Sequence, residues 1–371
     1  MKILFVGDAS NLNNTLAHAL RDMGHTATVA SSGSQWMNTG RDIDLRRRPS
    51  KWGAIAYGWQ LLRALPLMRG YDVVELASPI FLELRPERLQ RIFHFLKRHN
   101  GRVVLNALST DWVYYHACHD GHTFRYSDYR LGDKPSPYVD SPEYHRQHQE
   151  NWGKAFMRRY NEHVLQHVDG VIACLWEYYA AYLTTGHPHV AYAGIPIDTG
   201  ALTFRPLEQA PATVKLFIGL QRDRMTVKGT DLLLEAARRV AAERPEECEL
   251  VVVENKPYAE YTQLMRQSHV LLDQLYSYTP ATNALIAMSQ GLVAVSGAEP
   301  EYYALIGEGD NHPIVNVSPL LPRHIDEQLH RILDHKDALP ALARASRDFV
   351  VKHNEMHLVA RRHLDFFDSL P

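Results

Sequence analysis

The chain has 371 residues, of which 45% are hydrophobic and 22% charged, a composition typical of folded globular proteins rather than disordered ones. This length exceeds what one hydrophobic core usually organises, so we expect two domains. The formal net charge of −2 argues against a nucleic-acid-binding protein held by bulk positive charge, and three widely spaced cysteines suit a reducing compartment.

The apolar stretch at the N-terminus is too short, and too soon broken by Gly7 and Asp8, to be a signal peptide. No apolar run approaches the roughly 18 residues that a membrane-spanning helix needs. We therefore expect a cytoplasmic protein.

The first half of the chain alternates short apolar runs with helical patterns. An unbroken apolar run at 2–7 is typical of a strand covered on both faces, and the helical stripe of 11–23 stops at Gly24. Further strands are predicted at 26–30, 71–77, 102–107 and 168–174, with a helix at 88–99. This alternation predicts a doubly wound, Rossmann-like α/β domain over residues 1–195.

The alternation restarts after a proline-containing connection at 196–212. Strands are predicted at 214–219, 249–254, 270–273 and 292–296, and helices at 230–243, 258–268 and between 277 and 291. We therefore expect a second doubly wound domain over 213–340 and a C-terminal helix over 341–371 that returns to the first domain. Two such domains facing a cleft would bind ligands at the carboxyl ends of their strands.

Between Trp112 and Trp152 the pattern dissolves into a segment rich in Tyr, His, Asp and Pro. Its aromatic residues favour an ordered binding loop over a disordered one. Asp111 ends a central strand and is our first candidate for a catalytic acid or base, although Ser109 to Asp111 could equally cap a turn.

Three histidines follow Asp111 at intervals of three residues, namely His116, His119 and His122. His116 and His119 are further catalytic candidates, as polar groups on a loop over the cleft. Because a loop leaves the convergence of these side chains unspecified, we expect no metal site here.

A basic turn joins a predicted strand to a helix in GLQRDRMTVKGTDLLLEA, residues 219–236. Arg222, Arg224 and Lys228 stand where a phosphate would bind, with forked donors and a compact charge suited to a diphosphate. Gly229 would let the backbone approach closely. The alternative is a solvated basic turn at the surface.

The segment SYTPATNALIAMSQG, residues 277–291, predicts a helix that has Pro280 in its first turn and ends at Gly291. Thr279 is the expected cap, and the main-chain N–H groups of Thr282 and Asn283 would favour a phosphate at the positive end of the helix. No carboxylate is expected to repel it. The alternative is an ordinary amphipathic core helix.

Together these segments resemble the GT-B nucleotide-sugar glycosyltransferases, specifically the large retaining, family 4-like group. The likeness rests on FIGLQRDRMTVKGTDLLLEAARRV, on GIPIDTGALTFRP and on LIAMSQGLVAVSG, which occur in the family's order and cover most of the second domain. The family's Glu-x7-Glu pair is absent, because its two positions are Tyr278 and Ile286 here. In the family these glutamates contact the donor sugar and the ribose.

The resemblance implies a donor diphosphate held by Arg222, Arg224, Lys228, Thr282 and Asn283. Candidates for binding the donor sugar or nucleoside are Gly219, Asp273, Gln274, Tyr278, Thr279, Pro280, Ala281, Glu299 and Glu301. The resemblance implies a hexosyltransferase-like reaction in which a sugar moves from a UDP- or GDP-linked donor substrate to an acceptor hydroxyl. It also implies retention of the anomeric configuration and a role in polysaccharide or glycoconjugate synthesis. No cofactor and no metal are expected.

Two segments are candidates for the acceptor side. Gly7, Asp8, Ala9 and Ser10 end the first strand and would line the cleft. RRRPSKWGAIAYGWQLLRALPLMR, residues 46–69, is a basic run leading into a Trp-rich helix, a pattern found on anionic membranes. A sugar or lipid-linked acceptor at the inner-membrane surface would fit that pattern. We favour the alternative, a core-facing helix with solvated cations.

Two other functions remain open on the same fold. The first is isomerisation of the nucleotide-sugar 2-epimerase kind, which would need acid and base groups but no acceptor site. The second is non-catalytic binding of a sugar nucleotide by a degenerate transferase, a hypothesis that the missing glutamates support. The absence of GxGxxG after the first strand argues against a bound nicotinamide or flavin.

Overall fold

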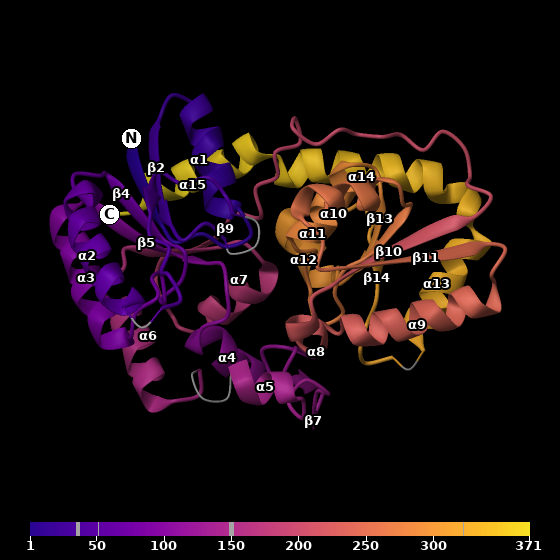
Figure 1. Ribbon diagram of the computed structural model, residues 1–371, viewed down its shortest axis with the longest axis horizontal. Helices are drawn as coiled ribbons and strands as arrows, with labels where there is room; N and C mark the ends of the chain where they lie inside the picture. The colour runs from indigo at the N-terminus through magenta and orange to yellow at the C-terminus, as the bar shows by residue number, and fades with distance from the viewer. Residues whose placement is uncertain (35–37, 51, 148–151, 322) are drawn as a thin grey trace. The chain divides into compact units, whose positions relative to one another are not determined.

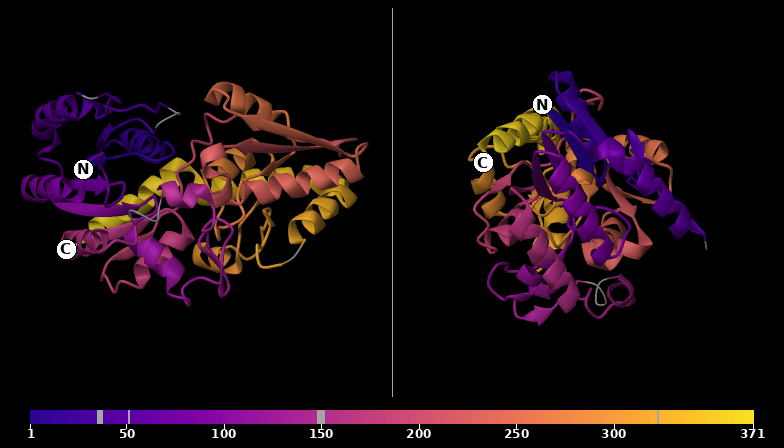
Figure 2. Two further views of the ribbon diagram at one scale, coloured as in Figure 1. Left: turned by 60° about the horizontal axis from the view of Figure 1, so that its bottom comes forward. Right: turned by 90° about the vertical axis from the view of Figure 1, so that its left-hand side faces the viewer.

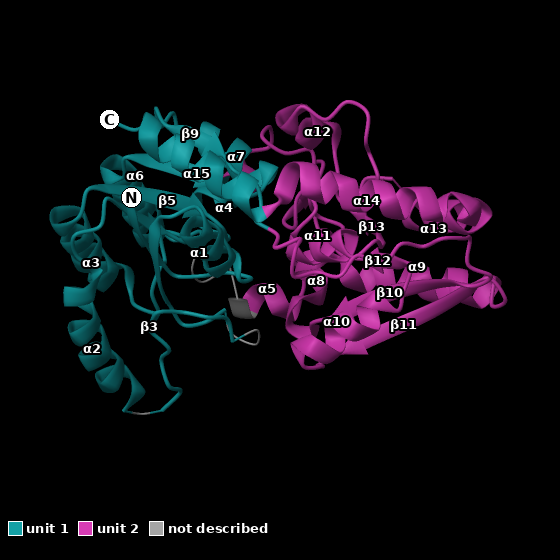
Figure 3. Cartoon of the chain, turned by 90° about the horizontal axis from the view of Figure 1, so that it is seen from above, with its two compact units in different colours: residues 1–116, 151–196, 356–371 teal, residues 117–150, 197–355 magenta. Residues whose placement is uncertain are grey.

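The computed structural model describes residues 1–34, 38–50, 52–147, 152–321 and 323–371. The chain forms two compact units (Figure 3). Unit 1 comprises residues 1–116, 151–196 and 356–371, and unit 2 comprises residues 117–150 and 197–355. None of the helices within the described ranges is both long and apolar enough to cross a membrane.

Unit 1 is built on a parallel sheet with the strand order β3-β2-β1-β4-β5-β8-β9. The strands are β1 (Lys2–Val6), β2 (Thr26–Ser31), β3 (Ile43–Asp44), β4 (Val73–Leu76), β5 (Arg102–Ala107), β8 (Gly170–Ala173) and β9 (Val190–Tyr192). Ile3 to Val6 are fully buried, as their unbroken apolar run predicted. The chain reverses its winding direction between β1 and β4, as in a doubly wound fold.

Helices cover both faces of this sheet (Figure 1). On one face α1 (Leu12–Asp22) and α15 (Met356–Ser369) share a hydrophobic core with β1, in which Phe5, Leu16 and Phe367 are buried. On the other side lie α3 (Pro86–His99) and α6 (Ala155–His167). The remaining helices associated with unit 1 are α2 (Gly53–Ala64), η2 (Leu65–Met68), α4 (Trp112–His119), which runs three residues into unit 2, and α7 (Trp176–Leu183).

Unit 2 is built on a second parallel sheet, with the order β11-β10-β12-β13-β14. Its strands are β10 (Val214–Leu220), β11 (Cys248–Glu254), β12 (Val270–Leu272), β13 (Val293–Ser296) and β14 (Val315–Asn316). Helices α9 (Thr230–Glu243) and α13 (His324–Asp334) cover one face, and α10 (Tyr258–Arg266), α11 (Thr282–Ser289) and α14 (Leu339–Asn354) cover the other (Figure 1). Shorter helices are η3 (Arg222–Arg224), α8 (Met225–Lys228), α12 (Pro300–Ile306) and η4 (Lys336–Ala338). The predicted fold class, two doubly wound α/β units, is confirmed.

Residues 117–150 belong to unit 2 and not to the first domain, where the sequence pattern had placed them. The described part of this excursion, 117–147, contains the hairpin β6 (Arg130–Leu131) and β7 (Lys134–Pro135) and the helix α5 (Pro142–Gln147). Its tyrosines Tyr126, Tyr129, Tyr138 and Tyr144 are buried. The segment is ordered, as predicted, because these rings pack against one another and against unit 2.

The C-terminal tail is two helices rather than the single helix predicted (Figures 1 and 2, yellow). The break falls at Glu355, whose ψ of 134° is not helical. Helix α14 belongs to unit 2 and α15 to unit 1. A histidine of each helix bonds a buried glutamate of its own unit: His353 Nε2 lies 2.7 Å from Glu308 Oε2, and His363 Nδ1 lies 2.9 Å from Glu75 Oε2.

The contact of His363 with Glu75 should be required for the stability of unit 1. Glu75 is fully buried in β4, and its other oxygen accepts a 2.6 Å bond from Asn106 Nδ2. Replacing His363 by Leu leaves a buried carboxylate short of a partner, so we expect a loss of about 3–5 kcal/mol in the free energy of unfolding. Urea denaturation measures this loss.

His357 on the same helix supplies the matched control. Its contact with Asp22 is exposed, so His357→Leu should cost less than about 1 kcal/mol. Equal losses for the two variants would show that the buried contact has no special role.

Candidate functional site

The candidate site lies in unit 2, where the carboxyl ends of β10 and β12 meet the start of α11. Asp273 directly follows β12 and is buried. Its Oδ1 accepts a 3.3 Å bond from Asn283 Nδ2, and Asn283 Oδ1 accepts a 3.0 Å bond from Tyr261 Oη. Lys228, which ends α8, is near enough for its charge to act on Asp273. The structure therefore brings together three of the predicted residues, Lys228, Asp273 and Asn283.

Burial and charge work in opposite directions in this cluster. Burial raises the pKa of Asp273, and the charge of Lys228, the amide of Asn283 and the N–H of Ala281 partly offset this. Burial lowers the pKa of Lys228, while Asp273 opposes that shift. Each group thus favours the charged form of the other, in a site with little water.

The start of α11 differs from the prediction in two ways. The residue before the helix is Ala281, which makes no side-chain capping bond, so Thr279 is not the cap and Pro280 lies outside the helix. The carboxylate of Asp273 also lies beside this end, where none was expected. An incoming anion would therefore compete with Asp273 for Lys228 and Asn283. The predicted end at Gly291, with φ of 93°, is confirmed.

Two glycines allow the close packing that shapes the site. Gly229 has a φ of 66°, and a Cβ there would lie 2.8 Å from Leu275 Cβ. The missing side chain thus makes room for Leu275, and the predicted close approach of this backbone to a phosphate stays a prediction. A Cβ at Gly219, on β10, would lie 2.5 Å from Tyr261 Oη. Only glycine at that position lets Tyr261 reach Asn283.

The basic turn is not the open cation cradle that the sequence suggested. Arg222 is exposed and forms a forked ion pair with Glu254, whose second bond, from Nη2 to Oε2, is 3.2 Å long. Arg224 is exposed and lies near Glu143 of α5, whose pKa its charge lowers against the larger effect of burial. Each of the three predicted diphosphate cations, Lys228 included, therefore has a carboxylate nearby.

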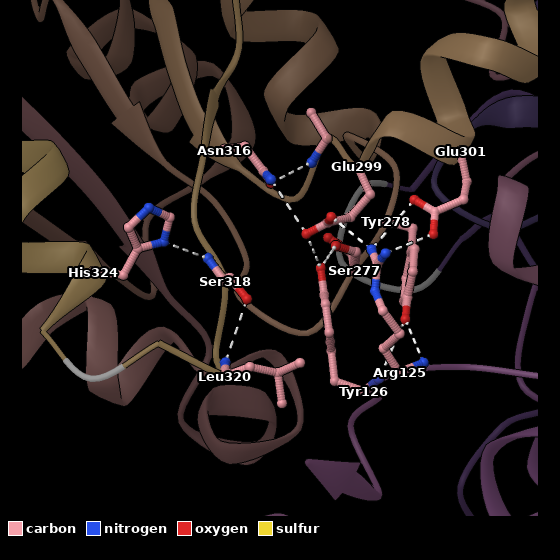
Figure 4. A network of polar contacts seen from close by, with 11 residues as sticks. Arg125, Tyr126, Ser277, Tyr278, Glu299, Glu301, Asn316, Ser318, Leu320 and His324 are labelled. Atoms are coloured by element: carbon pink, nitrogen blue, oxygen red, sulfur yellow. Dashed lines mark hydrogen bonds and ion pairs between the residues drawn. The ribbon is translucent and has the colours of Figure 1, made fainter. Parts of the chain in front are cut away.

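Tyr278 is buried by the excursion (Figure 4). Its hydroxyl oxygen accepts bonds of 2.7 Å and 3.2 Å from the main-chain N–H groups of Arg125 and Tyr126. The rings of Tyr126 and Tyr278 stack with centroids 4.7 Å apart. Tyr278 therefore anchors residues 117–147 on unit 2.

Glu299 and Glu301 take part in the same network. Arg125 pairs with both carboxylates, at 2.7 Å and 2.9 Å. Tyr126 Oη donates 2.8 Å to Glu299 Oε1, which also accepts a 3.2 Å bond from Asn316 Nδ2. These contacts give both glutamates a structural role, which the sequence had not suggested. Gln274, also predicted for the donor, is half-buried directly after Asp273.

Asp111 lies in unit 1, at the start of α4, and is buried. Its Oδ1 accepts a 2.9 Å bond from the N–H of Tyr114, and its Oδ2 accepts one from Tyr182 Oη. This geometry fits the alternative interpretation, a helix cap, better than an acceptor-facing base. Burial raises the pKa of Asp111 to about 6.

The predicted loop histidines lie on or just after a helix instead. His116 is an exposed residue of α4 whose ring stacks on Trp112 with centroids 5.0 Å apart. His119, also exposed, ends α4 and lies against Tyr129 in unit 2. His122 is exposed beside Asp120. Among the described residues, no group of three or more His, Cys, Asp or Glu side chains is placed to hold a metal ion.

The predicted acceptor-side residues lie at the carboxyl end of β1, as expected. Asp8 is half-buried and accepts bonds from the N–H of Asn13 and the hydroxyls of Ser34 and Thr39, at 2.9–3.0 Å. Gly7 has a φ of 90°. Ala9 is half-buried and Ser10 exposed.

Four contributing residues were missed, namely Tyr261, Glu143, Arg125 and Tyr126. Tyr261 acts through the space left by a glycine on a different element, and the other three come from the excursion. No pattern within their own segments indicates these contacts. The richness of the excursion in tyrosine was the only signal of its packing.

Comparisons with known proteins agree with this fold. No protein-family model and no curated protein matches the chain. A structure of Anabaena HepE in complex with UDP and glucose is similar over 100% of both chains, with a TM-score of 0.62 and 13% identity. Sucrose-phosphate synthase from Thermosynechococcus elongatus covers 99% of this chain and 98% of its own, with a TM-score of 0.64 and 13% identity. A glycosyltransferase from Rickettsia africae covers 99% of this chain and 98% of its own, with a TM-score of 0.58 and 11% identity. The chain thus has the fold of these glycosyltransferases.

The raised pKa of Asp111 predicts a pH-dependent contribution to stability. The folded protein holds the proton more tightly than the unfolded chain, so this contribution is complete below about pH 4 and is lost as pH rises through about 6. Between about pH 4 and 7, the free energy of unfolding of wild type should fall by on the order of 2–3 kcal/mol relative to that of Asp111→Asn. Parallel urea denaturation across this range measures the difference.

Asp133→Asn, which changes a fully exposed carboxylate, is the control and should show no such trend. A stability difference between wild type and Asp111→Asn that does not change with pH would contradict the assignment.

Removing the Tyr126 hydroxyl should loosen the excursion. Tyr126→Phe deletes the bonds to the Ser277 carbonyl and to Glu299, which are 3.0 Å and 2.8 Å long and buried. We expect the free energy of local unfolding of the excursion to fall by about 1–3 kcal/mol. Hydrogen exchange in 117–147 and at Ser277 to Tyr278 should therefore be faster. Tyr71→Phe, which loses a single exposed bond to Leu67, should leave exchange there unchanged. Unaltered exchange in Tyr126→Phe would contradict the anchoring role.

Proposed function

We propose that this protein is a nucleotide-sugar glycosyltransferase, which moves a sugar from a UDP- or GDP-linked donor to the hydroxyl of an acceptor. The observation that carries the proposal is the cluster of Lys228, Asp273 and Asn283 at strand ends in unit 2. Strand carboxyl ends and helix N-termini are where α/β sheets bind phosphorylated ligands. The fold shared with HepE, solved with UDP and glucose, supports the same assignment.

In this proposal the donor diphosphate lies against Lys228 and the first amides of α11. The bond from the sugar carbon to the diphosphate oxygen breaks, and the departing diphosphate gains negative charge. Lys228 and Arg224 stabilise that charge, so this arrangement requires no metal ion. Asp273 and Asn283 accept or donate hydrogen bonds to the sugar or the phosphate in place of the two missing glutamates.

The acceptor hydroxyl attacks the sugar carbon and gives up its proton. We propose that His116 or His119 accepts this proton, because both side chains are exposed. Asp111 is less suited to this role because both of its carboxylate oxygens already accept hydrogen bonds. Retention of configuration and a role in polysaccharide or glycoconjugate synthesis follow from the family resemblance. A sugar or a lipid-linked sugar at the inner-membrane surface is the proposed acceptor, in a cytoplasmic enzyme.

Non-catalytic binding of a sugar nucleotide is the second candidate. It is favoured by Tyr278, which takes the place of a donor-contacting glutamate and is engaged in anchoring the excursion. Calorimetry with UDP-, GDP- and TDP-sugars, followed by chromatography of the products, separates the candidates. Donor binding with release of UDP or GDP supports the transferase, and binding without turnover supports the second candidate. A changed sugar without any acceptor would instead identify an epimerase.

Lys228 should be needed for diphosphate binding. Lys228→Met keeps the aliphatic stem but removes the charge, and a bond from a charged donor is worth about 1.5–3 kcal/mol, so affinity for UDP should fall roughly 10- to 100-fold. Lys215→Met, at the other end of β10, is the control and should bind UDP like wild type. Unchanged affinity in a folded Lys228→Met protein would show that the anion site lies elsewhere.

A further inference from the structure

Helix α2 of unit 1 carries its large apolar side chains outward. Trp52, Ile55, Trp59 and Leu62 are 75%, 57%, 62% and 61% exposed, and Leu67 in the following turn is 60% exposed. The first four are spaced by three or four residues and so form one stripe along the helix. The sequence-based expectation of a core-facing helix is therefore wrong for this stripe.

The opposite side of α2 holds the helix to unit 1. Gly53, Tyr57, Leu61 and Ala64 are buried, and Gln60 donates a 2.6 Å bond to the Asp44 carbonyl. Tyr57, Leu61 and two small residues thus suffice for packing, which leaves both tryptophans, Ile55 and Leu62 exposed. Figure 3 shows α2 at the margin of that unit.

The outward stripe differs from the other exposed apolar residues. Those residues, namely Phe156, Leu183, Val252, Leu320, Leu321 and Val351, are scattered over several elements. Single exposed apolar residues are ordinary on soluble proteins, whereas a contiguous patch indicates an interaction surface.

The charged residues in the segment that carries the stripe are all positive. Residues 45–70 contain no Asp or Glu, and they include Arg46, Arg47 and Arg48 a few residues before α2, Arg63 in it and Arg69 after it. All five of these arginines are exposed. A helix with tryptophan and aliphatic residues on its outer side and arginines around it suits the interface of an anionic lipid layer, where indole rings lie among the headgroups.

We propose that α2 and the preceding arginines form a docking surface for anionic lipid. Trp52, Ile55, Trp59 and Leu62 enter the headgroup region, and Arg46 to Arg48 contact lipid phosphates. The helix has 12 residues and one packed side, so it lies along the surface and does not cross it. This proposal does not depend on the donor site, since all of its residues belong to unit 1 and none is assigned to that site.

Vesicle co-sedimentation of the whole protein tests the proposal. Wild type should bind vesicles containing phosphatidylglycerol, bind pure phosphatidylcholine vesicles much more weakly, and be released by salt. Trp52→Ser combined with Trp59→Ser should lower the affinity roughly tenfold or more. Arg47→Gln combined with Arg48→Gln should reduce binding to the anionic vesicles in particular.

Leu183→Ser, which changes an exposed apolar residue on α7, is the matched control and should bind like wild type. Circular dichroism and donor calorimetry on each variant check that the rest of the protein is intact. Failure of wild type to bind the anionic vesicles, or equal binding by the tryptophan variant, would overturn the proposal. So would sedimentation that shows wild type self-associating through this surface, with the tryptophan variant monomeric.

Discussion

The buried hydroxyl of Tyr278 is the contact on which the arrangement of unit 2 depends. Its oxygen receives two main-chain N–H groups of the excursion, and its ring stacks on Tyr126. Through this contact a segment lying between two stretches of unit 1 becomes part of unit 2. An aromatic residue suits this role because it offers both a stacking face and a hydrogen-bonding tip.

Charge matching is the second theme of the site. Arg222 pairs with Glu254, Arg224 lies near Glu143, and Lys228 interacts with Asp273. Lys228 is desolvated, which is costly for a cation without a nearby opposite charge, so Asp273 stabilises it before any ligand binds. A bound diphosphate must replace part of that stabilisation. The affinity for an anion would therefore reflect the contacts that the anion makes minus the contacts with carboxylates that it replaces. It should depend on the charge of Asp273.

The two C-terminal helices make the same kind of contact, a histidine bonded to a buried glutamate, each in its own unit. His353 bonds the buried Glu308 in unit 2, and ten residues later His363 bonds the buried Glu75 in unit 1. Both glutamates have further partners, Lys352 and Asn106 respectively, so neither carboxylate depends on one bond. Burial of such pairs specifies where a helix docks, because a shifted helix would leave a charge without a partner. The break at Glu355 divides the tail between the two units.

The short strands β3, β9 and β14 were not predicted from the sequence. The sequence by itself determined the other strands of both sheets, the glycine at 291 that follows α11, and the candidates Lys228, Asp273 and Asn283. These follow from local periodicity, from backbone conformations that only glycine adopts easily, and from the rule that ligands lie at strand ends. Only the tertiary structure decided that residues 117–147 join unit 2, that Asp273 lies at the start of α11, and that the tryptophans of α2 face outward. Each of these depends on contacts between residues far apart in the chain. A hydrophobic stripe shows that a helix has an apolar side, but the rest of the fold decides whether that side is covered.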